Sequence, residues 1–378
     1  MKKIIDKYVI NKYYFFTMTN LRIPGPTPLS PQVLTSLSQQ VISHRGKGYE
    51  KIHQEVVTNL QYFFQTKNPV YLLTASGTAG LETAVVNFFS PGDLVVFFTC
   101  GEFGNRWAEI ARRYGLNVNQ IKFPEGTGAR KEIVRQTLNK TKKLAAVFIT
   151  HNETGPGVLN DLFSIAPIVK DHPDKPLLLV DSVSALGGVN LPMDDLKIDV
   201  LVTASQKAWM ASPGIAMVSV SKTAWERQKL SKIPKYYLDL ALYEKFAQKN
   251  QTPATPAVSV LFSLHAALAL MKKQGREKIF KRHLELRNYF RGLVRKMGLK
   301  LVVDDRDASP TVTSIWPPKD VDEAVWRKLL REKYQTVIAG GMGGLKGKIV
   351  RVAHMGFVTK KDLDQVIDSF KKSLKEIT

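Results

Sequence analysis

Cysteine is almost absent from this sequence: among 378 residues, only Cys100 carries a thiol. A single thiol excludes an internal disulfide framework, a cysteine-rich zinc site, and an iron–sulfur or nickel–thiolate cluster held by this chain alone. We therefore expect a reducing compartment, either the cytoplasm or its equivalent inside an organelle. Apolar runs of membrane-spanning length are missing as well, so we expect no membrane span.

Acidic residues are scarce relative to basic ones. The chain has 33 Asp and Glu against 55 Lys and Arg, and the resulting net charge of +22 favours anionic partners. The densest basic stretch, 272–300, also carries apolar residues at roughly helical spacing, and we interpret it as the solvated outer face of a long amphipathic helix. A nucleic-acid-binding protein remains an alternative, although no RNA- or DNA-binding motif accompanies the basic residues.

Between residues 68 and 220, continuous apolar runs alternate with stretches of helical period. Continuous runs are typical of strands that are buried on both faces. Their alternation with helices, such as those expected at 79–89 and 104–114, predicts a mostly parallel sheet with helices on both sides. The expected strands are 70–74, 94–99, 145–150, 177–181, 200–204 and 216–220.

The pattern changes near residue 258. Helical spacing dominates 258–297, and short strands and helices follow it at 299–303, 311–315, 320–333, 349–353 and 360–376. We therefore predict a large domain over 21–270 and a smaller α+β domain over 271–378. Residues 1–20 differ in composition from the rest and include a second methionine, Met18. We expect them to be an atypical extension, possessing neither the apolar core nor the cleavage site of a signal peptide.

Residues that directly follow the predicted strands are the candidates for chemistry, because ligands of open α/β sheets bind at the carboxyl ends of the strands. A turn of small residues, 75–80, begins a helix and suits either a bound phosphate or a simple capped turn. Asp181 ends a buried strand, where a carboxylate needs a partner: a structural cap or a protonated ring nitrogen. Lys207 follows another buried strand, where burial can lower the pKa of an amine enough for Schiff-base chemistry, unless its position is accidental.

A phosphate cradle, a carboxylate and a lysine, in this order, are what pyridoxal phosphate requires. Over roughly residues 21–375 the sequence resembles the class V aminotransferases, of the alanine–glyoxylate and serine–pyruvate type. The order and spacing of the shared segments make the resemblance specific. These segments are 24–28 (PGPTP), 43–45 (SHR), 74–78 (TASGT), 91–93 (PGD), 150–155 (THNETG), 180–184 (VDSVS), 205–207 (SQK) and 346–351 (KGKIVR).

The resemblance implies an α/β fold of the type I pyridoxal-phosphate transferases and a role for individual residues. Lys207 would bind the cofactor covalently and move protons, and Asp181 would pair with the pyridinium nitrogen. Arg351 would grip the substrate carboxylate, with Gly25 in the N-terminal substrate loop. Further cofactor contacts would come from Ser76, Gly77, Thr78, Phe103, Thr154, Val183 and Gln206, and from Thr252 and Thr255 reaching the neighbouring subunit of a homodimer. No metal site is expected.

The implied activity is a ping-pong transfer of an amino group from alanine or serine to glyoxylate or pyruvate. Another class V enzyme, such as a 2-aminoethylphosphonate or phosphoserine transaminase, remains an alternative because the basic surplus leaves room for a second anion. A cysteine desulfurase would need a cysteine on a loop late in the chain, and Cys100 is badly placed for that role. Some relatives carry the label of a soluble-hydrogenase small subunit, but one cysteine excludes a metal–thiolate cluster in this chain.

Overall fold

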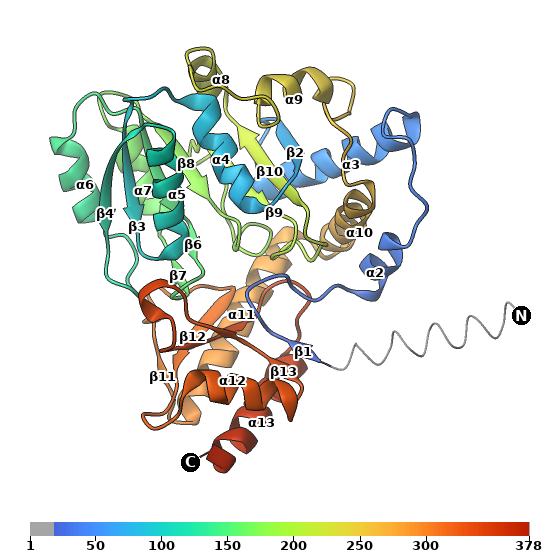
Figure 1. The fold of residues 1–378 in the computed structure, drawn as a ribbon, viewed down its shortest axis with the longest axis vertical. Helices are drawn as coiled ribbons and strands as arrows, with labels where there is room; N and C mark the ends of the chain where they lie inside the picture. Colours follow the sequence, from blue (N-terminus) through green and yellow to red (C-terminus); the bar gives the residue numbers. More distant parts are fainter. Residues whose placement is uncertain (1–18, 378) are drawn as a thin grey trace, which may run out of the picture.

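The computed structural model describes residues 19–377, and its largest element is a seven-stranded sheet (Figure 1). The strand order is β2-β10-β9-β8-β5-β3-β4, and β10 alone runs antiparallel to its neighbours. The predicted fold class is therefore confirmed. The strands are β2 (Val70–Thr74), β3 (Leu94–Thr99), β4 (Asn117–Lys122), β5 (Ala146–Thr150), β8 (Leu177–Asp181), β9 (Val200–Ala204) and β10 (Ile215–Val220).

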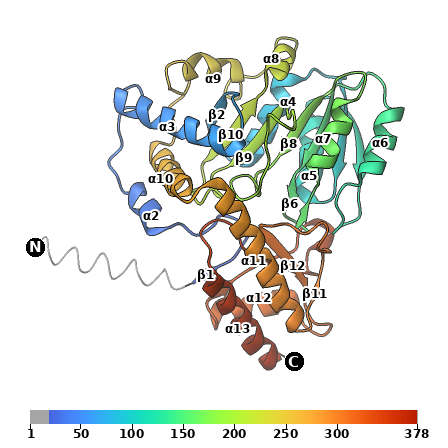
Figure 2. The same ribbon diagram turned by 180° about the vertical axis from the view of Figure 1, so that it is seen from behind.

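Helices cover both faces of this sheet, because alternate apolar residues of each strand point to opposite sides. Val95 and Phe97 of β3 pack into one apolar cluster with four helices, whereas Val96 and Phe98 pack into a second cluster on the other face. Figures 1 and 2 show the two layers from opposite sides. The first layer contains α4 (Gly77–Phe88), α5 (Glu102–Arg113), α8 (Lys222–Gln228) and α9 (Leu240–Ala247); the second contains α3 (Lys47–Phe64), α6 (Lys131–Lys140), α7 (Leu162–Lys170) and α10 (Val258–Gln274).

Strand β4 was absent from the sequence-based expectations. Its residues NVNQIK are mostly polar and only partly buried, because β4 lies at the edge of the sheet and pairs with β3 alone. The search for continuous apolar runs identifies strands in the middle of a sheet and therefore overlooks an edge strand of this kind.

The C-terminal part of the chain forms a second, smaller layered unit. A four-stranded antiparallel sheet has the order β11-β12-β15-β14 and packs with three helices around its own apolar cluster. This separate core supports the division near residue 270, which we keep as a proposal. Its elements are α11 (Arg276–Lys296), β11 (Lys300–Leu301), β12 (Val312–Trp316), α12 (Glu323–Glu332), β14 (Ala339–Gly340), β15 (Val350–Ala353) and α13 (Lys360–Ile377).

Short elements connect the two units. Strand β1 (Asn20–Leu21) pairs with β13 (Thr336–Val337), so the first described residues lie beside the C-terminal part. Helix α2 (Pro31–Leu37) follows and packs on α10. The expected extension over residues 1–20, including Met18, lies outside the described residues except for its last two. Strands β6 (Asn152–Glu153) and β7 (Val158–Leu159) form a hairpin after β5.

The basic stretch 272–300 differs from its interpretation as the outer face of one long helix. The helix breaks at Gly275, which has a φ of +85°, a conformation that glycine adopts readily. Arg291 is only 2% exposed, and its guanidinium donates to Asp305 (2.9 Å) and to the carbonyl of Val303 (2.7 Å). The prediction of a fully solvated face was therefore wrong at Arg291, because a spacing pattern cannot show an acceptor on a neighbouring loop.

Each helix between residues 19 and 377 is either too short or too polar to span a bilayer.

Candidate active site

The predicted strand-end residues come together at one edge of the central sheet. Parallel pairing places the carboxyl ends of β3, β5, β8 and β9 side by side. Asp181 ends β8, and Phe103, Thr154 and Lys207 follow the other three strands. Helix α4 begins at the same edge, after β2, with Ser76 as its N-cap. The fold therefore brings residues that are more than 100 positions apart into one site.

Lys207 provides an amine at this end of the strands. Its Nζ donates a hydrogen bond to the carbonyl of Pro24, on the N-terminal loop. That loop approaches so closely that a Cβ on Gly25 would lie 2.6 Å from the Lys207 Nζ; Gly25 also has a φ of +108°, which favours glycine. Burial, together with the charge of Arg351, lowers the pKa of Lys207 to about 8, although Asp181 opposes this shift. A large fraction of the amine is therefore neutral near pH 8 and able to act as a nucleophile.

Asp181 is a buried carboxylate at the carboxyl end of β8 and is 3% exposed. It accepts hydrogen bonds from the backbone N–H of Val183 (2.9 Å) and from Thr150 Oγ1 (3.4 Å), and forms no ion pair with a residue in the described range. Burial raises the pKa of Asp181 to about 6, although these hydrogen bonds and Lys207 lower it. A buried carboxylate without a cation is costly, so its position calls for a further partner.

The start of α4 provides free backbone donors. The first turn of a helix leaves N–H groups without intrahelical acceptors, and the N-cap Ser76 makes no capping hydrogen bond with its side chain. Gly77 lies against the ends of β8 and β9: a Cβ there would be 3.1 Å from Val183 and 3.3 Å from Ala204. Gly77 therefore lets the helix start approach these strand ends, and Thr78 is partly exposed beside it.

Gln206 and Phe103 follow the carboxyl ends of β9 and β3 in the chain. The Gln206 Oε1 is buried and has no hydrogen-bond partner. An unpaired buried polar atom is unusual in proteins and indicates a missing partner. Phe103 is partly exposed at the start of α5, with the Arg106 guanidinium 5.0 Å from its ring centre.

Arg351 reaches the site from β15 of the C-terminal unit. Its Nε donates to the carbonyl of Gly340 (2.6 Å), and its Nη1 donates to the carbonyl of Thr154 (3.0 Å). The Thr154 hydroxyl in turn donates to Ser184 Oγ (2.7 Å). Burial lowers the pKa of Arg351 to about 10, and the nearby Glu153 opposes this shift. Two of its five N–H groups are thus engaged by backbone carbonyls.

Thr252 and Thr255 lie on the segment before α10, and the N–H of Ala257 in this segment donates to Thr74 Oγ1 at the end of β2 (3.0 Å). Thr252 is buried, with its hydroxyl bound to the carbonyl of Ala254 (2.8 Å), whereas Thr255 is exposed. Arg45 holds the segment by donating to the carbonyls of Thr252 (2.6 Å) and Pro253 (3.1 Å). The segment SHR was noticed in the sequence, but this anchoring role of Arg45 was not predicted.

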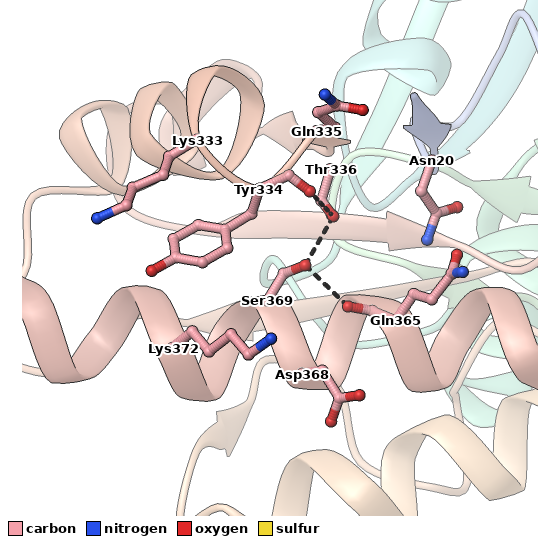
Figure 3. Close-up of a pocket in the computed structure, with 9 residues that line it drawn as sticks. All are labelled: Asn20, Lys333, Tyr334, Gln335, Thr336, Gln365, Asp368, Ser369 and Lys372. Atoms are coloured by element: carbon pink, nitrogen blue, oxygen red, sulfur yellow. Dashed lines mark hydrogen bonds between the residues drawn. The ribbon is translucent and has the colours of Figure 1, made fainter. Parts of the chain in front are cut away.

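A cavity of about 410 Å³ lies elsewhere, between α13 and the connection from α12 to β13 (Figure 3). It is lined by polar residues such as Tyr334, Thr336 and Ser369, and none of the predicted site residues takes part in it. It is therefore separate from the strand-end site.

Comparisons with known proteins agree with this geometry. The family model for aminotransferase class V matches residues 20–366. The chain belongs to the class V aminotransferase family. It is accordingly an aminotransferase, as the sequence predicted.

The similar proteins include one named for a soluble hydrogenase and several named as aminotransferases. The "Soluble hydrogenase 42 kDa subunit" of Anabaena cylindrica is 40% identical over 94% of this chain and 93% of its own length. The alanine–glyoxylate aminotransferase of Callithrix jacchus is 34% identical over 93% of this chain and 86% of its own length. The crystal structure of an alanine–glyoxylate aminotransferase from Nostoc sp. superposes with a TM-score of 0.90 at 30% identity, over 94% of this chain and 95% of that one.

Proposed function

We propose that this aminotransferase uses pyridoxal phosphate and transfers an amino group from a small amino acid, alanine or serine, to glyoxylate or pyruvate by a ping-pong mechanism. The observation that carries the proposal is the convergence of the Lys207 amine, the Asp181 carboxylate and the Arg351 guanidinium at one edge of the sheet. The alanine–glyoxylate aminotransferases among the similar proteins support the choice of substrates.

The residues present fit this cofactor. The unpaired Gln206 Oε1 offers an acceptor to a bound donor group, and Asp181 offers an acceptor to a protonated ring nitrogen. The free N–H groups at the start of α4 suit a phosphate. Ser76, Gly77 and Thr78 would hold the phosphate, and Phe103, Thr154 and Val183 would contact the ring.

Bound pyridoxal phosphate supplies an electron sink for the charge left at the substrate's α-carbon when a proton departs. The protein's own task is to move that proton and to hold the charges around it. The Lys207 amine, with its pKa lowered to about 8, takes the proton and returns it. Asp181 keeps an adjacent ring nitrogen protonated, and Lys207 balances part of its negative charge.

Arg351 binds the substrate carboxylate through its free N–H groups, since a planar guanidinium matches a carboxylate with two parallel hydrogen bonds. Its orientation is fixed by the carbonyls of Gly340 and Thr154. A substrate with a second anion would need another cation nearby. Arg327, which lies against Gly340, is already bound to Glu323. This pairing favours substrates with a single carboxylate over phosphoserine, which carries a second anion.

The protein is also proposed to form a homodimer. Thr255 is exposed on the segment that Arg45 anchors, in a position to reach a neighbouring subunit. Val41 and Ile42, just before Arg45, are 56% and 37% exposed, although both are large and apolar. Exposed apolar side chains beside a functional segment support a protein partner at this surface.

The substrate claim is tested with a panel of amino donors against glyoxylate, pyruvate and 2-oxoglutarate, with analysis of the oxo acids formed. We expect alanine or serine with glyoxylate or pyruvate to give the highest kcat/KM, and 2-oxoglutarate to be poor. A preference for 2-oxoglutarate or for a phosphorylated donor would contradict the single-carboxylate assignment.

A further inference from the structure

Glu153 is a buried carboxylate in the site that the sequence did not single out. It is 0% exposed and lies in β6, next to Thr154. Three backbone N–H groups donate to it: those of Phe103 (3.1 Å), Gly104 (3.0 Å) and Gly155 (3.3 Å). Burial raises the pKa of Glu153 to about 7, although these hydrogen bonds lower it. The free-energy cost of such burial suggests a specific task for this group.

The side-chain carboxylate of Glu153 caps the start of helix α5, although Glu153 itself lies outside that helix. Helix α5 begins at Glu102, and its own N-cap position, Gly101, has no side chain to accept from the first N–H groups. Glu153 accepts from two of them, and a carboxylate is also favoured by the positive end of the helix dipole. Gly101 makes this approach possible, because a Cβ there would lie 2.5 Å from Glu153 Cγ. Glu153 thereby fixes the backbone of Phe103.

The backbone of Glu153 connects it to Arg351, the proposed substrate-binding residue. This backbone continues into Thr154, whose carbonyl accepts from Arg351 Nη1. Arg351 in turn holds Gly340, at the edge of the glycine-rich segment 340–344. Phe103 of the large unit and Arg351 of the C-terminal unit are thus joined through one dipeptide, Glu153–Thr154.

We propose that Glu153 is a positioning residue that couples the ring-flanking residue Phe103 to the substrate-binding residue Arg351. The inference rests on the proposed function for its catalytic meaning, but the mechanical link is a property of the protein without cofactor. Glu153 itself need not touch the substrate: it acts by holding the start of α5 and the Thr154 carbonyl in a single arrangement.

Two variants and one control separate this role from ordinary stabilisation. Glu153→Ala removes the link, whereas Glu153→Gln keeps the shape and one carbonyl acceptor but loses the charge. Asp199→Asn is the matched control. Asp199 is also buried and also accepts from a backbone N–H, that of Leu178 (2.8 Å), but it lies at the amino end of β9, away from the site.

The first readout is hydrogen exchange of the cofactor-free protein. In Glu153→Ala we expect the backbone amides of 101–105 and of 339–345 to exchange about tenfold faster, as for the loss of a helix cap. Glu153→Gln should give a smaller increase in both segments, and Asp199→Asn none in either. Faster exchange at 101–105 alone would overturn the coupling, because Arg351 and Gly340 would then be held independently of Glu153.

The second readout uses the enzyme loaded with pyridoxal phosphate. We expect Glu153→Ala to raise both the cofactor Kd and the KM for the oxo acid about tenfold, with a smaller fall in kcat, and Glu153→Gln to lie between it and the wild type. An unchanged Kd and KM, with a loss of stability equal to that of Asp199→Asn, would show a purely structural role and refute the proposal. If the wild type takes up no pyridoxal phosphate, the proposed function fails, and hydrogen exchange still decides whether Glu153 couples the two segments.

Discussion

The carboxyl ends and the amino ends of the central strands each hold a buried aspartate, and the surroundings of the two aspartates differ. Asp199, just before β9, is 4% exposed, binds the Lys170 ammonium, and accepts from the N–H of Leu178 and from Ser221 Oγ (2.9 Å). Asp181, at the end of β8, is 3% exposed but has no ion-pair partner among residues 19–377. The charge of Asp199 is thus paired within the chain itself. The charge of Asp181 has no such partner. An unpaired buried charge is typical of a functional site rather than of a structural ion pair.

The lysines near the two aspartates should therefore respond very differently to removal. Lys207→Ala should lower turnover by at least about 10³-fold, because it removes the nucleophile and the proton carrier together. Lys170→Ala should lower stability but leave the turnover per folded molecule nearly unchanged. Steady-state kinetics together with urea unfolding of both variants measures the contrast. Retained transamination in Lys207→Ala would break it.

The aspartates should show the opposite balance between activity and stability. Asp181→Asn should reduce kcat by about 10²-fold while leaving the cofactor-free protein at least as stable, since it removes an unpaired buried charge. Asp199→Asn should cost about 3 kcal/mol of unfolding free energy, because it leaves the partly buried Lys170 charge without its partner. Equal losses of kcat in the two variants would mean that both aspartates are structural.

The pH dependence of stability sharpens the same comparison. The folded-state pKa of Asp181 is raised, to about 6, so its contribution to stability is fully present below the unfolded-state pKa and is lost as the pH rises through 6. We expect the unfolding free energy of the cofactor-free wild type, relative to Asp181→Asn, to fall between about pH 4 and pH 7. The upper limit of this fall is about 3 kcal/mol. A difference that stays constant over this range would contradict the unpaired state of Asp181.

The sequence was sufficient where a single segment carries the signal. Asp181 ends one continuous apolar strand and Lys207 comes shortly after another, so both the strands and these strand-end residues could be predicted. Parallel pairing then guarantees that such residues meet at one edge. The motifs also identified Gly25, whose small size the Lys207 side chain requires.

Contacts between distant segments could not be predicted. Glu153 acts through Phe103, 50 residues away, and the only sequence signal was a glutamate inside the segment 150–155, which lies at a buried strand end. Arg291 was expected on a solvated face because its acceptors, Asp305 and the carbonyl of Val303, lie on a later loop. In each case a polar residue takes its role from a partner whose position depends on tertiary packing.

The attachment point of the cofactor is the most direct test of the account. The purified protein is supplied with pyridoxal phosphate, reduced with borohydride, digested and analysed by mass spectrometry. We predict a pyridoxyl adduct on the peptide that contains Lys207, together with an absorbance band near 400 nm before reduction. A protein that stays colourless, or an adduct on any other lysine, would contradict the central claim.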